Sequence, residues 1–221
     1  MHRTLLTILA GLLITGIATA AAAKSWRVVT RTDGITVSVR DDPSGGFPTF
    51  KGVGVVYGSI YHVAAVISDV PRHTQWMGSC KHARILRREG ELVYVIYSQT
   101  DAPWPVSDRD AVYHSRATVT RPGKELVIRF KAIRTRAMPR KSGYVRMENL
   151  RGHFKLRALS NNRTWLEYQV DADPGGWLPR WLARLAARRL PLDSIRKLRL
   201  QVKRTRGRYD ARIRRWKQMQ L

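Results

Sequence analysis

Between residues 84 and 171 the sequence is a series of short runs that alternate apolar and polar residues, and this pattern restricts the fold more than any other feature. Such alternation is typical of strands with one buried face. The runs are ARIL, LVYVIYSQT, DAVYHSRATVT, ELVIRFKAI, YVRMENL, GHFKLRAL and TWLEYQVDA. The segments REGE, DAPWPVSD, RPGK, PRKSG and SNN separate them and are rich in turn-forming residues. Connections this short join neighbouring antiparallel strands, so we predict an antiparallel sheet.

The segments before this region add further strands and a helix. Residues 26–30, 35–40 and 49–58 are predicted to be strands, the first two joined by the turn signal TDG. Apolar residues then recur at helical spacing between residues 60 and 67, which predicts a short helix. Ser59 is in position to cap its N-terminus, and Pro71 is expected to end it.

After the segment DADPGG the apolar period becomes helical again, and it stays so almost to the end of the chain. The apolar stripe consists of Leu178, Trp181, Leu182, Leu185, Leu192, Ile195, Leu198 and Val202. Pro191 interrupts it, which predicts either a kink or two consecutive helices. The expected fold is therefore α+β, a strongly curved antiparallel sheet wrapped around a long C-terminal helix. Such an arrangement encloses a cavity.

Residues 1–23 have the pattern of a secretory signal peptide. His2 and Arg3 precede an apolar run that is followed by small residues suited to cleavage. The alternative is a retained anchor, but the run is shorter than the roughly 20 residues that a spanning helix needs. We therefore expect an exported protein. Cys80 is the only cysteine, so it is either buried as a free thiol or paired between chains.

The formal charge of +25 is concentrated near the C-terminus. Residues 180–221 hold 15 basic and 2 acidic side chains, a net charge of +13. Such a field attracts polyanions. In an exported protein we expect an anionic membrane surface, bound through the basic C-terminal helix, rather than nucleic acid. The alternative for the tail is a solvated helix face or a disordered end.

Arg109 opens one of the predicted strands and shares its parity with Ala111, Tyr113 and Ser115, the less charged face. It should therefore point into the interior, where a charge that cannot be lost needs a partner. The alternative is an edge arginine that reaches water or pairs with Asp108 or Asp110.

The neighbouring strands present apolar faces that either fill a core or line a pocket. One such face holds Leu126, Ile128, Phe130 and Ala132, and another holds Phe154, Leu156 and Ala158. The sequence contains no metal-ligand spacing, nucleophile elbow or glycine-rich phosphate loop, and its histidines are scattered. We therefore predict no catalytic site, no metal and no cofactor.

Several segments together resemble the START family of lipid-binding domains. PWPVSDRDAVY is similar to the family's Pro-Trp-Pro stretch with a later Arg-Asp pair. DPGGWLPRWLARLAARRLPLDSIRKLRLQV resembles the family's lead into its C-terminal helix. GYVRMENLRGHFKL and the tryptophan of TQWM resemble two further family segments. The resemblance covers roughly residues 26–206, so residues 24–206 are assigned to the domain and 207–221 to a basic C-terminal extension.

The resemblance implies a helix-grip fold with a hydrophobic tunnel that holds one lipid, of the sterol, hopanoid or phospholipid class. It places the family's inward arginine at Arg109, near the polar end of the ligand and paired with an acid. Glu91, Glu148 and Glu167 are all candidates for that acid. The predicted ligand-binding residues are Arg109, Trp76, Trp104, Tyr97, Tyr113, Phe130, Met147, Phe154, Trp177 and Trp181.

The signal peptide together with the resemblance implies a monomeric, periplasmic or otherwise secreted protein that carries or presents its lipid between membranes. The alternative is an enzyme of the same superfamily, such as a cyclase or hydrolase acting on a hydrophobic substrate. Such an enzyme would need polar groups that converge in the tunnel, and Tyr97, Tyr113, Glu167 and His114 are the candidates.

Overall fold

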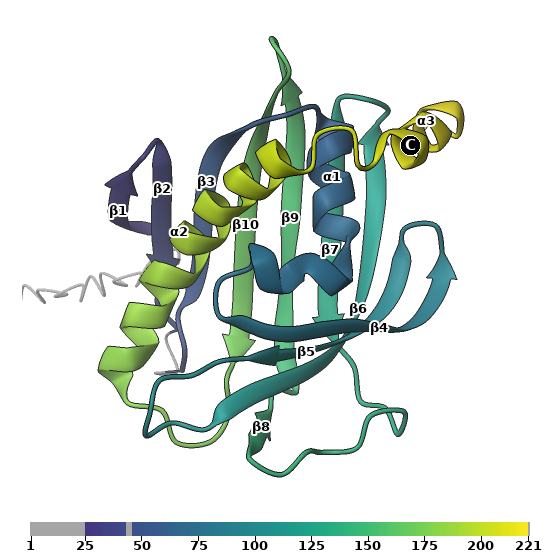
Figure 1. The fold of residues 1–221 in the computed structure, drawn as a ribbon. Helices are drawn as coiled ribbons and strands as arrows, with labels where there is room; N and C mark the ends of the chain where they lie inside the picture. The colour runs from purple at the N-terminus through teal and green to yellow at the C-terminus, as the bar shows by residue number, and fades with distance from the viewer. Residues whose placement is uncertain (1–24, 43–45, 221) are drawn as a thin grey trace, which may run out of the picture.

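The computed structural model describes residues 25–42 and 46–220, so the predicted signal peptide lies outside the described residues. Within these described residues, ten strands form one sheet, and three α-helices and a 3₁₀ segment accompany it (Figure 1). The elements are β1 (Arg27–Thr32), β2 (Ile35–Arg40), β3 (Thr49–Tyr57), α1 (Ile60–Ser68), η1 (Val70–Gln75), β4 (Cys80–Gly90), β5 (Val93–Thr100), β6 (Asp108–Arg121), β7 (Glu125–Ala132), β8 (Tyr144–Arg146), β9 (Asn149–Leu159), β10 (Arg163–Asp173), α2 (Arg180–Arg204) and α3 (Asp210–Gln218).

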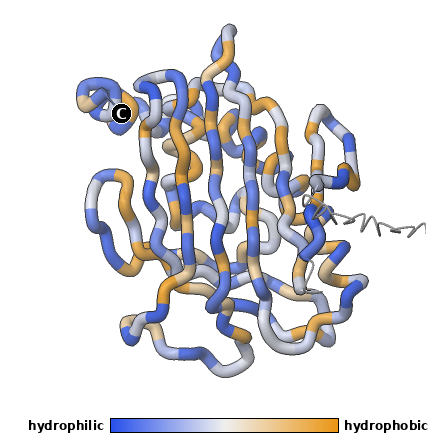
Figure 2. Tube along the Cα trace, turned by 180° about the vertical axis from the view of Figure 1, so that it is seen from behind, coloured by the Kyte–Doolittle hydropathy of each residue, from blue (hydrophilic) through white to orange (hydrophobic). Residues whose placement is uncertain are grey.

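The sheet has the order β1-β2-β3-β10-β9-β7-β6-β5-β4, and each neighbouring pair along this path is antiparallel. It curls so strongly that β4 and β5 run across the front of the molecule, below α1 (Figure 1). The predicted α+β helix-grip architecture is confirmed. Seen from behind, the chain trace alternates between hydrophilic and hydrophobic residues along the strands (Figure 2). This alternation is expected because successive side chains of a strand point to opposite faces of the sheet.

Helix α2 lies across the inner face of the sheet, over β2 and β3 (Figure 1). Glycine at position 52 of β3 permits this close approach, because an added Cβ would lie 2.9 Å from both Pro191 and Ile195 of the helix. The helix continues unbroken across Pro191. The predicted alternative of two consecutive helices at this position is therefore wrong.

Helix α1 packs on β9 and β10 beside α2. Its N-cap is the predicted Ser59, whose hydroxyl accepts a hydrogen bond from the His62 amide at 3.2 Å. The helix ends at Ser68, and Pro71 lies in the 3₁₀ segment that follows. Among the described residues no helix is long and apolar enough to cross a membrane.

The run YVRMENL does not form one strand as predicted. Residues 144–146 form β8, which pairs with β6 in parallel, and residues from 149 onward begin the much longer β9. Short connections join antiparallel neighbours, whereas β8 and β6 are parallel. A long loop from residue 133 to 143 makes this possible, because it brings β8 back to the start of β6.

Candidate functional site

A cavity of about 430 Å³ lies between the inner face of the curved sheet and α2, with the end of α1 and η1 forming another part of its wall. Its lining is mostly apolar. The larger apolar side chains in it are Phe50, Ile96, Phe130, Phe154, Leu178 and Leu182. The volume falls in the range of about 300–1,000 Å³ that is typical of small-molecule sites. The predicted hydrophobic cavity is therefore present.

Arg109, the first inward-facing residue of β6, lines this cavity and is only 4% exposed. Its guanidinium donates hydrogen bonds to three backbone carbonyl oxygens, those of Ser107 at 2.5 Å and of Gly175 and Trp177 at 3.3 Å each. Its Nε has no hydrogen-bond partner among the described residues. Burial lowers the pKa of Arg109, and the nearby Asp108 carboxylate opposes this effect. Arg109 is thus a buried cation held by neutral groups.

None of the three candidate acids pairs with Arg109. Glu91 accepts from α3, Glu148 pairs with arginines of the 133–143 loop, and Glu167 pairs with His153 and Lys51 on the outer face of the sheet. The expected carboxylate partner is therefore wrong for all three, since each is already engaged elsewhere. The carbonyl oxygens of the loop between β10 and α2 take its place.

Both aspartates beside Arg109 also have other partners. Asp108 accepts from Lys81 Nζ at 2.8 Å and from the Ala102 amide at 3.0 Å. Asp110 points to the outer face, where Arg146 of β8 donates to its two carboxylate oxygens at 2.7 and 2.9 Å. The alternative interpretation, an edge arginine in water or paired with one of these aspartates, therefore does not apply.

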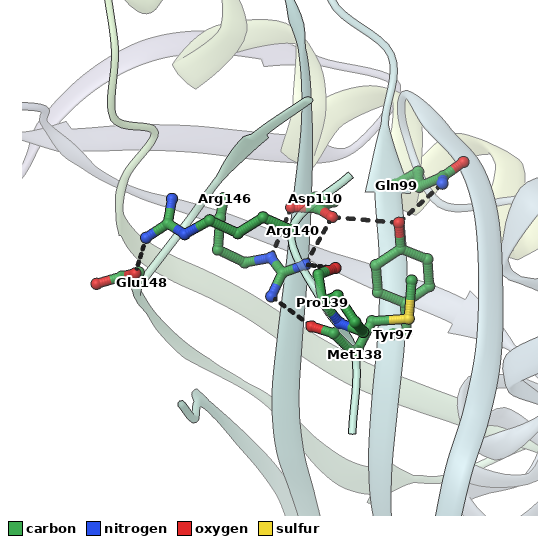
Figure 3. Close-up of polar contacts among 8 residues, drawn as sticks. All are labelled: Tyr97, Gln99, Asp110, Met138, Pro139, Arg140, Arg146 and Glu148. Atoms are coloured by element: carbon green, nitrogen blue, oxygen red, sulfur yellow. Dashed lines mark hydrogen bonds and ion pairs between the residues drawn. The ribbon is translucent and has the colours of Figure 1, made fainter. Parts of the chain in front are cut away.

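The Asp110–Arg146 pair is the centre of a buried polar network that sequence reasoning missed (Figure 3). Tyr97 donates to Asp110 at 3.2 Å and accepts from Gln99 at 2.8 Å. Arg146 also donates to the carbonyl oxygens of residues 138 and 139. The hydrogen bonds that Arg146 donates to Asp110 raise the pKa of Arg146. The network fastens β8 and the preceding loop to β6, immediately beside Arg109.

Half of the predicted ligand-binding residues meet in the cavity. These are Arg109, Tyr113, Phe130, Met147 and Phe154. Tyr113 and Phe130 lie on paired strands with ring centroids 5.9 Å apart. Strand parity explains the inward direction of both, because the alternating residues of β6 and β7 divide between the cavity and the outer face.

The other five predicted residues do not line the cavity. Tyr97 belongs to the outward parity of β5, where it packs beside Val112. Trp76 is buried behind the lining, with its ring against Phe154 at 6.0 Å. Trp104, Trp177 and Trp181 are 93%, 69% and 65% exposed, respectively. These three belong to segments whose neighbouring residues border the cavity, but their own rings lie in solvent.

Several cavity residues were not predicted, although strand parity would have found some of them. Tyr94, Ile96 and Ser98 form the inward parity of β5, and Tyr168 is the matching residue of β10. Tyr168 stacks on Phe154 with ring centroids 4.4 Å apart. Tyr97 was predicted because its side chain is large and aromatic, whereas the adjacent residues Ile96 and Ser98 are the ones that line the cavity.

Four titratable groups in the cavity wall, those of Tyr113, Tyr168, Cys80 and His73, are neutral at ordinary pH. Burial raises the pKa of Tyr113 and of Tyr168, and it raises the pKa of the Cys80 thiol to about 11. Burial also lowers the pKa of His73 to about 4, and its Nε2 lies 2.8 Å from the Ile67 carbonyl oxygen. Arg109 is therefore a buried cation in this wall, and the groups that accept its hydrogen bonds are backbone carbonyls.

The candidate acid and base residues do not converge. Tyr113 lines the cavity, whereas Tyr97, His114 and Glu167 belong to the opposite parity of their strands. His114 interacts with Glu89 at 3.0 Å on that outer face. Within residues 25–42 and 46–220, no group of three or more histidine, cysteine, aspartate or glutamate residues could hold a metal ion.

The curved sheet, the gripped helix and the apolar cavity between them define a helix-grip protein. The sequence matches the START domain family over residues 19–206, and the chain belongs to that family. It is 30% identical over 184 residues to an uncharacterised protein of Pseudomonas aeruginosa, and this aligned region covers 83% of this chain and 90% of that protein.

Several of the similar proteins are named as lipid transfer proteins. Bovine phosphatidylcholine transfer protein is 26% identical over 172 residues, covering 76% of this chain and 80% of that protein. Among solved structures, the StAR-related lipid transfer protein of Xanthomonas axonopodis has a TM-score of 0.73 at 27% identity, covering 80% of this chain and 98% of that chain.

Proposed function

We propose that this protein binds one lipid molecule in its internal cavity and carries or presents it between membranes. The observation that carries the proposal is the apolar cavity of about 430 Å³ in a START domain, with the Arg109 guanidinium in its wall. Hydrocarbon chains gain about 0.8 kcal/mol for each CH₂ group buried, so an apolar cavity can supply the affinity without chemistry. The cation suits the polar end of a sterol, hopanoid or phospholipid.

The test is to identify what the purified protein holds. Native mass spectrometry and solvent extraction should find one lipid for each chain after expression in a bacterium. A blocking variant, Ala117→Phe, places a ring in the cavity, and Thr118→Phe places the same ring on the outer face of the same strand. We expect loss of lipid in the first and retention in the second. An empty wild-type protein that takes up no lipid from a total bacterial extract would refute the proposal.

The exposed side of α2 supports contact with an anionic membrane. Its exposed cations are Arg180, Arg184, Arg188, Arg189, Lys197, Lys203 and Arg204. Trp181 and Leu200 are exposed beside them, and Asp193 is the one acidic residue of the helix. Cations near an anionic bilayer contribute about 1 kcal/mol each, and tryptophan favours the interface.

Vesicle cosedimentation tests this contact. Binding should be strong on phosphatidylglycerol vesicles, weak on phosphatidylcholine vesicles, and reduced by added salt. Replacing Arg184, Arg188 and Lys197 by glutamine should weaken it by at least tenfold. Equal binding to duplex DNA across the same salt series would favour a nonspecific polyanion site instead.

We propose in addition that the protein acts in the periplasm or outside the cell, on the basis of the sequence of residues 1–23. Fractionation of cells that express the full chain tests this directly. We also propose a role without catalysis, because the candidate acid and base groups on the described strands lie on opposite faces of the sheet. Turnover of a hydrophobic substrate that is lost in Tyr113→Phe would contradict that view.

A further inference from the structure

Helix α3 lies beyond the residues that match the family, yet it is packed against the domain. It sits beside α1, on the inner side of the sheet (Figure 1). Trp216 is 2% exposed and Tyr209, which precedes the helix, is 6% exposed. Both belong to the main hydrophobic core, and Ile213 packs against the same cluster. The extension is therefore a structural part of the molecule with a buried apolar side.

Three polar contacts fasten this segment to two different elements. Glu91, in the turn between β4 and β5, accepts from Trp216 Nε1 at 2.7 Å and from Arg215 Nη2 at 2.6 Å. The Tyr209 hydroxyl donates to Asp69, just after α1, at 2.7 Å. Helix α3 thus connects the β4–β5 turn to the C-terminal end of α1.

Those two elements are also walls of the cavity. Leu92, the residue after Glu91, lines it from the β4–β5 turn, and Ile67 lines it from α1. The β4–β5 turn is part of the sheet and α1 is not, so the contacts of α3 are one connection between these two walls of the cavity. Loss of the α3 contacts would allow them to separate at that end of the cavity.

The solvent side of the same segment is strongly basic. Its exposed cations are Arg206, Arg208, Arg214, Arg215 and Lys217, and Asp210 is the one acidic residue between positions 205 and 220. The helix is therefore amphipathic, with an aromatic and aliphatic side on the protein and a cationic side in water. Helices of this kind bind in the interface of anionic bilayers, with the apolar side inserted and the cations at the headgroups.

We propose that α3 is a latch that an anionic phospholipid bilayer releases. A bilayer can shift the latch only if it binds the two states differently. The docked helix offers the bilayer its cations alone. The released helix offers the same cations and also Trp216 and Ile213, which can insert into the interface. The bilayer therefore binds the released state more tightly, and release separates the two cavity walls where lipid exchange occurs. Only this last consequence depends on the proposed function.

The test measures the position of α3 directly. Nitroxide labels at Tyr57→Cys and Met219→Cys, both exposed, report the distance from β3 to the end of α3 in a Cys80→Ser background. We expect one narrow distance distribution in buffer and with phosphatidylcholine vesicles. Phosphatidylglycerol vesicles should add a second, broader population. An unchanged distribution with those vesicles, whether the protein cosediments with them or not, would overturn the proposal.

A matched pair of variants tests the contacts that hold the latch. Glu91→Gln removes the charge that accepts from Trp216 and Arg215, and it should raise the undocked fraction about tenfold without vesicles. Glu89→Gln alters a glutamate near the same turn, which contacts Arg87 and His114 instead, and should leave the distribution unchanged. If Glu91→Gln fails to fold, Arg215→Gln removes the same ion pair from the other side. Identical distributions for wild type and the Glu91 or Arg215 variant would contradict the latch.

The distance measurement needs no lipid in the cavity, so the two proposals fail separately. A protein that is empty after extraction but moves α3 on anionic vesicles would refute lipid carriage and support the latch. A protein that holds lipid but keeps α3 docked on anionic vesicles would support lipid carriage and refute the latch. With both intact, a pyrene-labelled phospholipid preloaded into the protein should transfer at least tenfold faster to phosphatidylglycerol than to phosphatidylcholine vesicles.

Discussion

The Asp110→Asn variant tests how much the fold around Arg109 depends on the buried ion pair between Asp110 and Arg146. The side chains of Asp110 and Arg146 are 1% and 11% exposed, and two hydrogen bonds join them. An amide cannot accept both of these bonds as a charged group would, so the guanidinium would remain buried without a counter-charge. Breaking a buried pair from one side typically costs about 3–5 kcal/mol. For a domain of this size, that cost lowers Tm by about 6–20 °C.

Urea unfolding followed by circular dichroism measures this loss, and two controls define it. Asp171→Asn breaks an ion pair with Arg151, whose side chain is 72% exposed, and should cost less than about 1 kcal/mol. Replacing the buried pair by Asp110→Leu and Arg146→Met together should recover most of the stability, because no unpaired charge remains. A single Asp110→Asn variant within 1 kcal/mol of wild type would refute the reasoning. So would a double variant that is no more stable than the single one.

Three further predictions concern the cavity walls. Gly152→Ala should destabilise the fold by about 1–3 kcal/mol, because the added Cβ would overlap the Gln169 carbonyl oxygen and meet the Phe130 ring at 2.5 Å. Gly90→Ala should be neutral, because its Cβ would meet only Val93, at an ordinary contact distance of 3.8 Å. His73 has a folded pKa of about 4 against an ordinary 6.5, so the unfolded chain binds more protons between these values. Stability should therefore fall by about 3 kcal/mol as the pH drops through that window, and the slope should flatten in His73→Gln. Arg109→Lys keeps the charge but loses the planar fork, so amides of the loop between β10 and α2 should exchange hydrogen about tenfold faster.

The sequence predicted those parts of the fold that have a regular period. Alternation located the long strands and gave Arg109 its inward direction, and the helical stripe located α2. Where three residues form a strand, as in β8, no period exists to be detected. Its parallel pairing depends on the Asp110–Arg146 contact, which joins residues 36 positions apart and has no local signature.

The candidate site was predicted well by parity and poorly by residue type. Tyr113 and Phe130 were placed correctly because their strands alternate. Tyr97 was included as a large aromatic residue, although parity assigns it to the outer face. The partner of Arg109 could not be predicted from the sequence, because every residue type has a backbone carbonyl group. The docking of α3 was also missed, since one buried tryptophan among many basic residues produces no apolar stripe.

The adjacent residues Arg109 and Asp110 explain how the start of β6 holds two neighbouring segments in place. Because neighbouring side chains on a strand point to opposite faces, one residue reaches inward and the other outward. Arg109 holds the carbonyl groups of the loop that leads into α2, and Asp110 holds Arg146 and with it β8. Polar contacts thus fix two irregular segments to one strand. A substitution at Asp110 should therefore disturb the part of the cavity wall around Arg109, although the Asp110 side chain faces away from the cavity. Packing among the lining residues alone would not produce such an effect.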